Sequence, residues 1–211
     1  MNIANPDLPE VLEPYLPSSI SEVVFMDGNT LSGEIFDNLE LYDSEFIESK
    51  LDKVSFKSSK LKGVKIRDCV FNNVNLSGAD MSEADITRAT FINCRMQGLN
   101  LSGSILQDVQ FVDSMLDMVN FRSIKFNSFS FKNCELNEAD FMSAVLVKGQ
   151  FQQCRIFDLN INHSKIKDVD FRQSELVSID GIAFLKGATI DESQMIQLAH
   201  EFAQMIGIKI K

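Results

Sequence analysis

The chain has 211 residues, is 45% hydrophobic and carries a formal net charge of −10 at pH 7. This length is enough to bury one substantial core. The N-terminus has no basic segment followed by an apolar one, and no apolar stretch reaches about 18 residues, so neither export nor a membrane span is expected.

Residues 1–21 contain all four prolines of the chain, Pro6, Pro9, Pro14 and Pro17. Proline has no backbone N–H and cannot donate a hydrogen bond to a strand ladder. The end of a repeat structure leaves backbone groups unpaired, so a cap is needed there. We therefore expect residues 1–21 to form a short helical or irregular N-terminal cap.

Residues 22–181 are dominated by a repeat of five residues. From Met26 to Leu176, every fifth residue is Leu, Ile, Met or Phe, which gives thirty-one consecutive positions. A second register lies two residues before each of these and holds mostly small side chains: Ala, Ser, Cys, Val or Gly. In a chain that is 45% hydrophobic, such a run does not arise by chance.

A period of five excludes the two regular structures of a straight backbone. Five residues of an α-helix turn by about 500°, which spreads the large residues around the whole surface. On a flat strand, an odd spacing places successive residues on opposite faces. The period fits a backbone that turns a corner every five residues, so that four sides close a square coil and the large residues point inward. The sequence thus predicts an all-β solenoid of nearly eight coils, with parallel strands about 4.8 Å apart.

Residues that are one coil, or 20 positions, apart then stack in columns inside the rod. One column contains six phenylalanines, Phe71, Phe91, Phe111, Phe131, Phe151 and Phe171. Glu34 is the one charged residue in the two inward registers. Phe129 is large for the small register, and we expect it to distort its coil locally.

The cysteines all fall in the small inward register, at Cys69, Cys94, Cys134 and Cys154. A free buried cysteine behaves as a small hydrophobic residue. Metal binding by Cys134 and Cys154, one coil apart, is the alternative, but no histidine or third thiol accompanies them. We expect no metal and no cofactor, and we take the reducing cytoplasm as the compartment.

The segment Lys50 to Arg67 forms a basic belt around one coil. It carries seven basic residues against the single acidic residue Asp52. The simplest interpretation is a solvated surface, and the alternative is a contact with phosphate or with an acidic partner.

Residues 182–211 are expected to form a C-terminal helix and tail. Thr189 to Glu192 resembles a capping box that opens a helix, and Gly207 is a plausible residue just past its end. Apolar residues at helical spacing and a strand-like tail indicate both a cap and a two-fold dimer contact. The expected dimer residues are Met195, Leu198, Phe202, Met205, Ile206, Ile208 and Ile210.

Enzymatic chemistry is not expected. The two histidines, His163 and His200, have no neighbouring arrangement that suggests a triad or a metal site. The sequence has no glycine-rich phosphate loop, and a filled rod offers no cavity for a small substrate. Function is therefore expected on the outer surface.

Outward negative charge is concentrated on two neighbouring sides of the predicted rod. These sides, centred on Met81 and on Leu76, each carry six acidic residues against three basic ones, and the other two sides are nearly neutral. The residues expected to contact a partner are Asp80, Glu83, Asp117, Glu135, Glu138, Asp140, Asp158 and Glu175. Several Asp and Asn residues just before the inward position, Asp80 and Asp140 among them, are expected to bond the corner backbone instead.

The segments Ala79–Glu83, Ala84–Arg88 and Glu138–Phe141 resemble pentapeptide repeats of the A(D/N)LXX type. That resemblance implies a right-handed quadrilateral β-helix. The acidic sides and the run from Met195 to Ile208 resemble the DNA-mimicking Qnr and MfpA quinolone-resistance proteins. This resemblance implies a homodimer that binds DNA gyrase or topoisomerase IV where DNA would lie and so opposes fluoroquinolones, without binding nucleic acid itself.

The alternative is a pentapeptide-repeat scaffold for another protein partner, since fold alone does not give function. Outward apolar residues favour it. They are Ile92 with Val112, Met115 with Met118, Met142 with Val145 and Val147, and Phe157.

Overall fold

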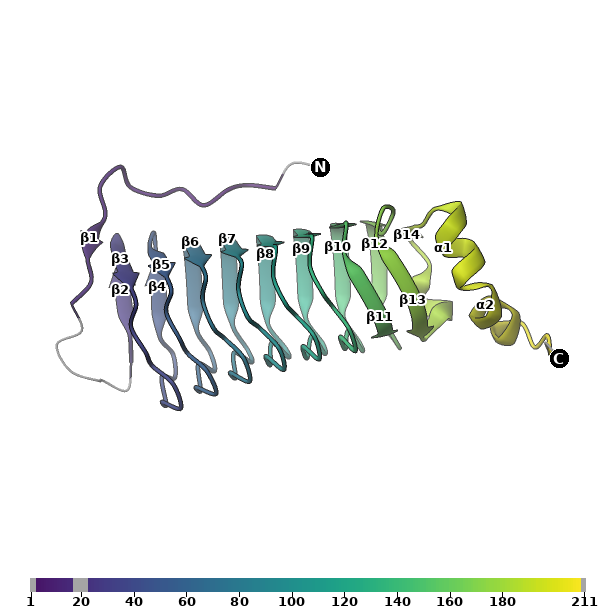
Figure 1. Ribbon diagram of the computed structural model, residues 1–211, viewed down its shortest axis with the longest axis horizontal. Helices are drawn as coiled ribbons and strands as arrows, with labels where there is room; N and C mark the ends of the chain where they lie inside the picture. The colour runs from purple at the N-terminus through teal and green to yellow at the C-terminus, as the bar shows by residue number, and fades with distance from the viewer. Residues whose placement is uncertain (1–2, 17–22, 210–211) are drawn as a thin grey trace.

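The computed structural model describes residues 3–16 and 23–209. It is a rod of stacked coils with an extended N-terminal arm along one side and short helices at the C-terminal end (Figure 1). The strands are β1 (Glu13–Pro14), β2 (Phe25–Asp27), β3 (Asn29–Ser32), β4 (Glu45–Ile47), β5 (Lys50–Asp52), β6 (Lys65–Asn72), β7 (Asp85–Ile92), β8 (Ile105–Val112), β9 (Lys125–Lys132), β10 (Val145–Gln152), β11 (Arg155–Asn160), β12 (Lys165–Asp170), β13 (Glu175–Asp180) and β14 (Ala188–Thr189). The helices are the 3₁₀ helix η1 (Ile182–Leu185), α1 (Glu192–Gln197) and α2 (Ala199–Met205).

All the strand pairs are parallel, and along the rod the pairing joins residues 20 positions apart, as the sequence predicts. Each strand from β6 to β10 bends at one corner and covers two sides, while the other two sides pair through single bridges such as Asn75↔Arg95 and Asp80↔Asn100. One column of paired residues runs through nine levels: Thr30, Lys50, Val70, Thr90, Gln110, Ser130, Gln150, Asp170 and Thr189.

The rod thus has about nine turns rather than the expected count of nearly eight. The difference lies at the C-terminal end. The five-residue register stops near Leu176, but β14 returns to the stack and pairs with β12 at Asp170↔Thr189, an offset of 19 residues. Periodicity alone does not reveal a last layer that is out of register.

Every corner of the rod uses the same backbone conformation. From Gly28 to Ser178, each fifth residue has a positive φ, without a gap, and the non-glycine residues among them have φ between 48° and 69°. Only glycine adopts this left-handed region freely, and Asn and Asp tolerate it better than other residues. The structure confirms the prediction of a corner every five residues.

The core is a continuous column of inward side chains. All thirty-one large-register residues are buried, and the exceptions in the small register, Asn29, Glu34 and Leu39, lie in the first coil. The expected phenylalanine ladder is present. Its ring centroids are 4.7 Å apart between Phe71 and Phe91 and 4.5 Å apart between Phe151 and Phe171, with stacked geometry. Stacking of this kind adds to the energy of burial.

Phe129 fits because the next coil leaves space for it. A Cβ atom at Gly149, one coil further on, would lie 2.1 Å from the Phe129 ring. The strand pairing is unbroken here, since Phe129 pairs with both Val109 and Gly149. The predicted distortion of the coil is therefore wrong, because the Phe129 ring packs over Gly149 in the next coil.

The N-terminal arm is extended rather than helical. Its strand β1 adds a parallel layer to β3, with hydrogen bonds from Glu13 N to Gly28 O (3.1 Å) and from Tyr15 N to Thr30 O (2.8 Å). Residues 3–12 then turn back over the outside of the rod (Figure 1). The parts of the predicted cap at residues 1–2 and 17–21 lie outside the described residues.

At the C-terminal end, the structure corrects the predicted helix start. The N-cap is Asp191, not Thr189, because Thr189 is already paired in β14. The capping box joins Asp191 to Gln194. The expected single helix is interrupted at Leu198, which has ψ of 7° and caps both α1 and α2. The predicted short strand at 208–211 is not formed at residues 208 and 209, and residues 210 and 211 lie outside the described part.

Gln194 seals the last coil. Its side chain is buried, and its Nε2 donates hydrogen bonds of 2.7 Å to the carbonyl oxygens of Phe171 and Ser174, while its Oε1 accepts one from Asp191 N. These carbonyls belong to a coil that has no complete neighbour beyond it. The buried amide therefore replaces part of a missing strand.

Candidate interaction surfaces

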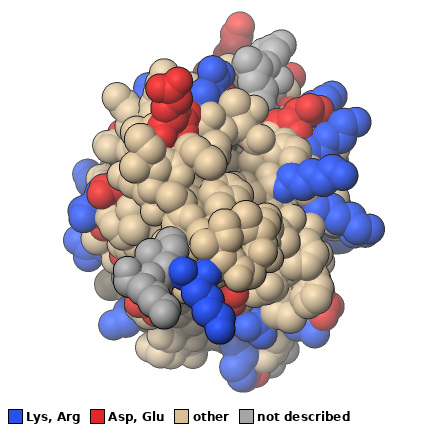
Figure 2. Space-filling view, turned by 90° about the vertical axis from the view of Figure 1, so that its right-hand side faces the viewer, with Lys and Arg blue, Asp and Glu red and all other residues tan. Residues whose placement is uncertain are grey.

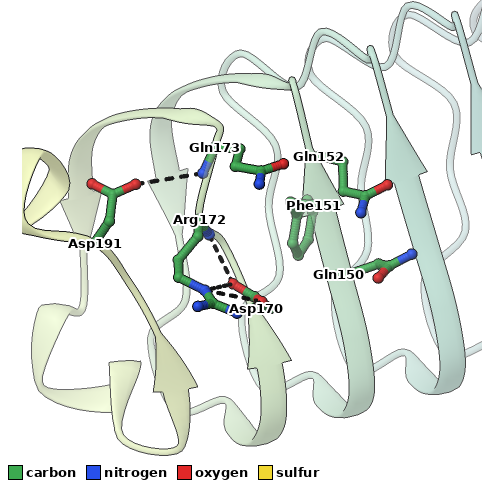
Figure 3. A pocket seen from close by; sticks show the side chains of 7 residues that line it. All are labelled: Gln150, Phe151, Gln152, Asp170, Arg172, Gln173 and Asp191. Atoms are coloured by element: carbon green, nitrogen blue, oxygen red, sulfur yellow. Dashed lines mark hydrogen bonds and ion pairs between the residues drawn. The ribbon is translucent and has the colours of Figure 1, made fainter. Parts of the chain in front are cut away.

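The rod has a filled interior and shallow hollows outside. One hollow of about 380 Å³ lies on the side formed by β10 and β12 (Figure 3). Within residues 3–16 and 23–209, no three His, Cys, Asp or Glu side chains are grouped so that they could hold a metal ion. No helix in the described chain is long and apolar enough to cross a membrane.

The four cysteines are free and buried. Burial raises the pKa of the Cys69 and Cys94 thiols to about 12. Contact with Cys154, together with burial, raises the pKa of Cys134. Thiols held in the protonated form are poor nucleophiles and poor metal ligands, so Cys69, Cys94 and Cys134 act as packing groups.

The predicted acidic residues lie on two neighbouring sides, but many of them already have partners. Glu83 pairs with Lys62 at 3.0 Å, Asp140 pairs with Arg122, and Arg155 lies 3.4 Å from Glu135. The Arg155 guanidinium also lies 3.9 Å from Glu175. Pairing of this kind offsets part of the negative charge that the sequence places there.

Three of the eight predicted acidic residues, Asp80, Asp117 and Asp140, accept hydrogen bonds within the rod. Asp80 accepts a hydrogen bond from Ser82 N (3.0 Å) and one from the Asn100 side chain (2.8 Å). Asp117 accepts two hydrogen bonds from Asn137, one from the Asn137 backbone N (3.0 Å) and one from the Asn137 side chain (2.7 Å). The predicted corner role is thus confirmed for Asp80, and also for Asp140, which accepts from Met142 N at 2.9 Å.

Glu138 and Asp158 are the exposed members of the set for which the described residues provide no ion-pair partner or side-chain hydrogen bond. Both are corner residues with positive φ, and they are one coil apart on the same edge of the rod. They are the carboxylates that remain available to a partner on this edge.

The basic belt is partly neutralised by the preceding coil. Lys60 lies against Glu40, and Lys65 lies 2.7 Å from Glu45. Exposed pairs of this kind contribute little to stability, but they lower the net charge of the belt.

The C-terminal end has few charged side chains at its centre (Figure 2), and several apolar side chains are exposed there. Ile196 is 76% exposed, Ile206 66% and Ile208 53%, and Met195 and Met205 are each about half exposed. By contrast, Leu198 is fully buried, and Phe202 packs against the core. These two predicted dimer residues therefore hold the helices onto the rod. Ile210 lies outside the described residues.

Three features of the surface were not predicted from the sequence. These are the docked arm, the Gln194 seal and a separation of charge across the second half of the rod. The arm carried only a weak signal, its prolines and alternating apolar residues. Gln194 carried none, because a buried glutamine in an amphipathic helix looks like a solvated one.

The corners of this rod recur every five residues, and its inward positions alternate between small and large side chains. This is the architecture of pentapeptide-repeat proteins. The family model described as a pentapeptide repeat region matches residues 64–141 and 104–180, and the model described as pentapeptide repeats (8 copies) matches residues 40–78. These matches cover more than half of the chain. The protein therefore belongs to the pentapeptide-repeat family. Proteins of this family are generally non-enzymatic scaffolds.

Among solved structures, the chain is similar to full-length QnrB1, a plasmid-mediated fluoroquinolone resistance protein. The identity is 18%, the match covers 88% of this chain and 95% of that chain, and the TM-score is 0.56. A trypsin-treated form of QnrB1 matches at 18% identity over 90% of this chain and 98% of that chain, with a TM-score of 0.53. HetL, from the cyanobacterium Nostoc sp., matches at 16% identity over 80% of this chain and 90% of that chain, with a TM-score of 0.30. No curated protein sequence matches the chain. At these identities, the similarities establish the fold alone.

Proposed function

We propose that this protein is a non-catalytic rod that binds DNA gyrase or topoisomerase IV in place of DNA, and so protects the enzyme from fluoroquinolones or inhibits it. The observation that carries the proposal is the set of carboxylates along two neighbouring sides of a straight rod. A surface that attracts the phosphates of DNA also attracts a rigid rod with carboxylates in a similar arrangement. The similarity to QnrB1, a fluoroquinolone resistance protein, supports it at the level of the fold.

The proposal also includes a homodimer joined through the C-terminal end. The exposed apolar residues there, Ile196, Met205, Ile206 and Ile208, form a surface of the kind that pairs with a second copy. Two rods joined end to end would present the acidic sides over twice the length. Light scattering of Ile206→Glu tests this step, and we expect a monomer. Phe202 is unsuitable for that test, because it packs against the core of its own chain.

The main experiment is a DNA gyrase supercoiling assay, with and without ciprofloxacin, to which the purified protein is added. We expect rescue or inhibition at micromolar protein, and at least a fivefold loss of effect for Glu138→Lys/Asp158→Lys. The control, matched in charge to each of the two single substitutions, is Asp168→Lys. Asp168 is also an exposed corner residue with positive φ, but it lies on the opposite side of the rod. A protein with no effect on gyrase or on topoisomerase IV would exclude the proposal.

A scaffold for another protein partner is the second candidate. It is favoured by the ion pairs that offset the acidic sides and by exposed apolar residues on one of those sides. Met118 is 57% exposed and Met115 40%. If Met118→Lys reduces the effect on gyrase more than the Glu138→Lys/Asp158→Lys variant does, apolar contact rather than charge drives binding.

A further inference from the structure

The N-terminal arm lies along one corner of the rod. We call this corner, with the parts of the two sides that meet there, a lane; it runs the length of the rod, and the arm covers about half of it. Asp7 N donates to Asp68 Oδ1 (3.0 Å), Ala4 N donates to Asp108 Oδ1 (3.3 Å), and the Gln110 side chain donates to Asn5 Oδ1 (2.9 Å). Asp68 and Asp108 stand at the same corner, two coils apart. The three residues from Asp7 to Ala4 span about 10 Å when extended, which matches two coil spacings of about 4.8 Å.

The same lane continues, uncovered, over the second half of the rod. Adding 20 to the positions that hold the arm gives the next corner and side residues. We call this surface the open lane; it consists of Ser128, Ser130, Lys148, Gln150, Asp168 and Asp170, with the flanking residues Lys125, Lys132, Val145, Val147, Lys165 and Lys167. The hollow shown in Figure 3, lined by Gln150, Gln152 and Arg172, lies along it.

The open lane is basic, and its lysines are unpaired. Arg172 is bound to Asp170 at 2.7 Å, but none of Lys125, Lys132, Lys148, Lys165 and Lys167 has a carboxylate partner in the described chain. In the covered half, Lys65 pairs with Glu45 and Arg88 pairs with Asp68, while Lys50 and Arg67 have no ion-pair partner in the described chain. Viewed from the C-terminal end, Lys and Arg side chains are densest along one edge of the molecule, and others lie at the opposite edge and at the bottom (Figure 2).

The arm is an example of an extended segment that lies on this lane. Residues 3–16 contain three acidic residues, Asp7, Glu10 and Glu13, and no basic ones. Between them, apolar side chains such as Pro6, Leu8 and Leu12 are half-buried against the rod while the acidic side chains remain exposed. The open lane offers a similar combination, because the half-buried Val145 and Val147 lie among the lysines.

We propose that the open lane binds an extended polypeptide segment of a partner protein in which acidic residues alternate with apolar ones. The segment continues the path of the arm along the rod, with its carboxylates against the lysines and its apolar side chains on Val145 and Val147. This surface lies opposite the acidic sides and does not depend on the proposed topoisomerase binding.

The test is a fluorescence-anisotropy titration of the full chain with three labelled probes. The first is a synthetic peptide with the sequence of residues 3–16. The second is the same peptide with Asn and Gln in place of its acidic residues, and the third is a 12-nucleotide single-stranded DNA. We expect the acidic peptide to bind at least tenfold more tightly than the neutral one, with an affinity that falls as salt is raised.

Lys148→Glu/Lys167→Glu should weaken binding of the acidic peptide at least tenfold. The matched control is Lys53→Glu/Lys57→Glu, which changes the charge equally. Lys53, like Lys148, is an exposed corner residue with positive φ, but it lies away from the lane. The proposal fails if the neutral peptide binds equally well or if the control variant weakens binding as much. It also fails if the DNA binds more tightly than the peptide through the same lysines, because the lane is then a nucleic-acid surface.

Discussion

The two ends of the rod are closed by different means. At the N-terminal end, the two residues of β1 cover one side of the first coil through backbone hydrogen bonds, and Glu34 remains exposed. At the C-terminal end, η1, β14 and two helices pack over the last coil, and the buried Gln194 bonds its carbonyl oxygens. We infer that the C-terminal end is the more firmly closed, and that substitutions there unfold more of the rod than substitutions at the other end.

The largest effect is expected at Gly187, where the chain leaves η1 for β14. A Cβ atom there would lie 2.1 Å from Ile166 O, and φ is +97°. Gly187→Ala should lower the free energy of unfolding by about 2–5 kcal/mol, the sum of left-handed strain and overpacking, as measured by chemical denaturation. Gly207→Ala is the control. Its φ is +82° with nothing within 4 Å, so only about 1–2 kcal/mol of strain is expected. Equal losses would show that the contact with Ile166 is unimportant.

Gln194→Leu tests the seal itself. The apolar side chain keeps the volume but removes both hydrogen bonds to the last coil. Ser174 O is then left without a partner in the described chain, and Phe171 O keeps only Ser174 N at 3.3 Å. We expect Gln194→Leu to lower the free energy of unfolding by about 2–3 kcal/mol. Hydrogen exchange should show faster opening of β12 and β13 than of β6. The control is Gln197→Leu, at an exposed position on the same helix; a similar loss for both variants would contradict a sealing role.

The middle of the rod could be predicted from the sequence, whereas the contacts that close its ends could not. The corners, columns and phenylalanine ladder follow from a strict period of five, so their positions could be predicted from the sequence. Gly187 and Gln194 act once each, in contacts between segments that no period relates. The acidic sides were placed correctly, but Arg122 and Arg155 were not expected to pair with Asp140 and Glu135, because pairing depends on side-chain reach between coils.

Asp68→Asn, in β6 where the N-terminal arm is held on the rod, should have a smaller effect. Burial alone would raise the pKa of Asp68, but hydrogen bonds from the Arg88 side chain and Asp7 N outweigh it and hold the pKa below its usual value. Stability from this ionised group is therefore fully present above about pH 4 and is lost as pH falls through the lowered pKa of the folded state. We expect Asp68→Asn to lower the free energy of unfolding by about 1–2 kcal/mol at pH 7 and to speed proteolysis of residues 3–16. As the pH is lowered, the variant should lose less stability than the unmodified protein. A variant with the same acid dependence as the unmodified protein would show that the arm is held by other contacts.

The smallest effect is a gain in the middle of the rod, at Met118. This residue occupies a corner with φ of 57° and is 57% exposed, so its side chain contributes little packing while its backbone is strained. Asn tolerates the left-handed region better, and Met118→Asn should stabilise by about 0.5–1 kcal/mol. The matched control is Met115→Asn, at an exposed position on the same side whose φ is not positive, where no gain is expected. Because each coil of a solenoid mainly contacts its neighbours, the gain should appear as slower hydrogen exchange in the coils next to residue 118 and leave β1 and α1 unchanged. A gain that spread to both ends would mean that the rod unfolds as one cooperative unit and that the two caps are coupled through it.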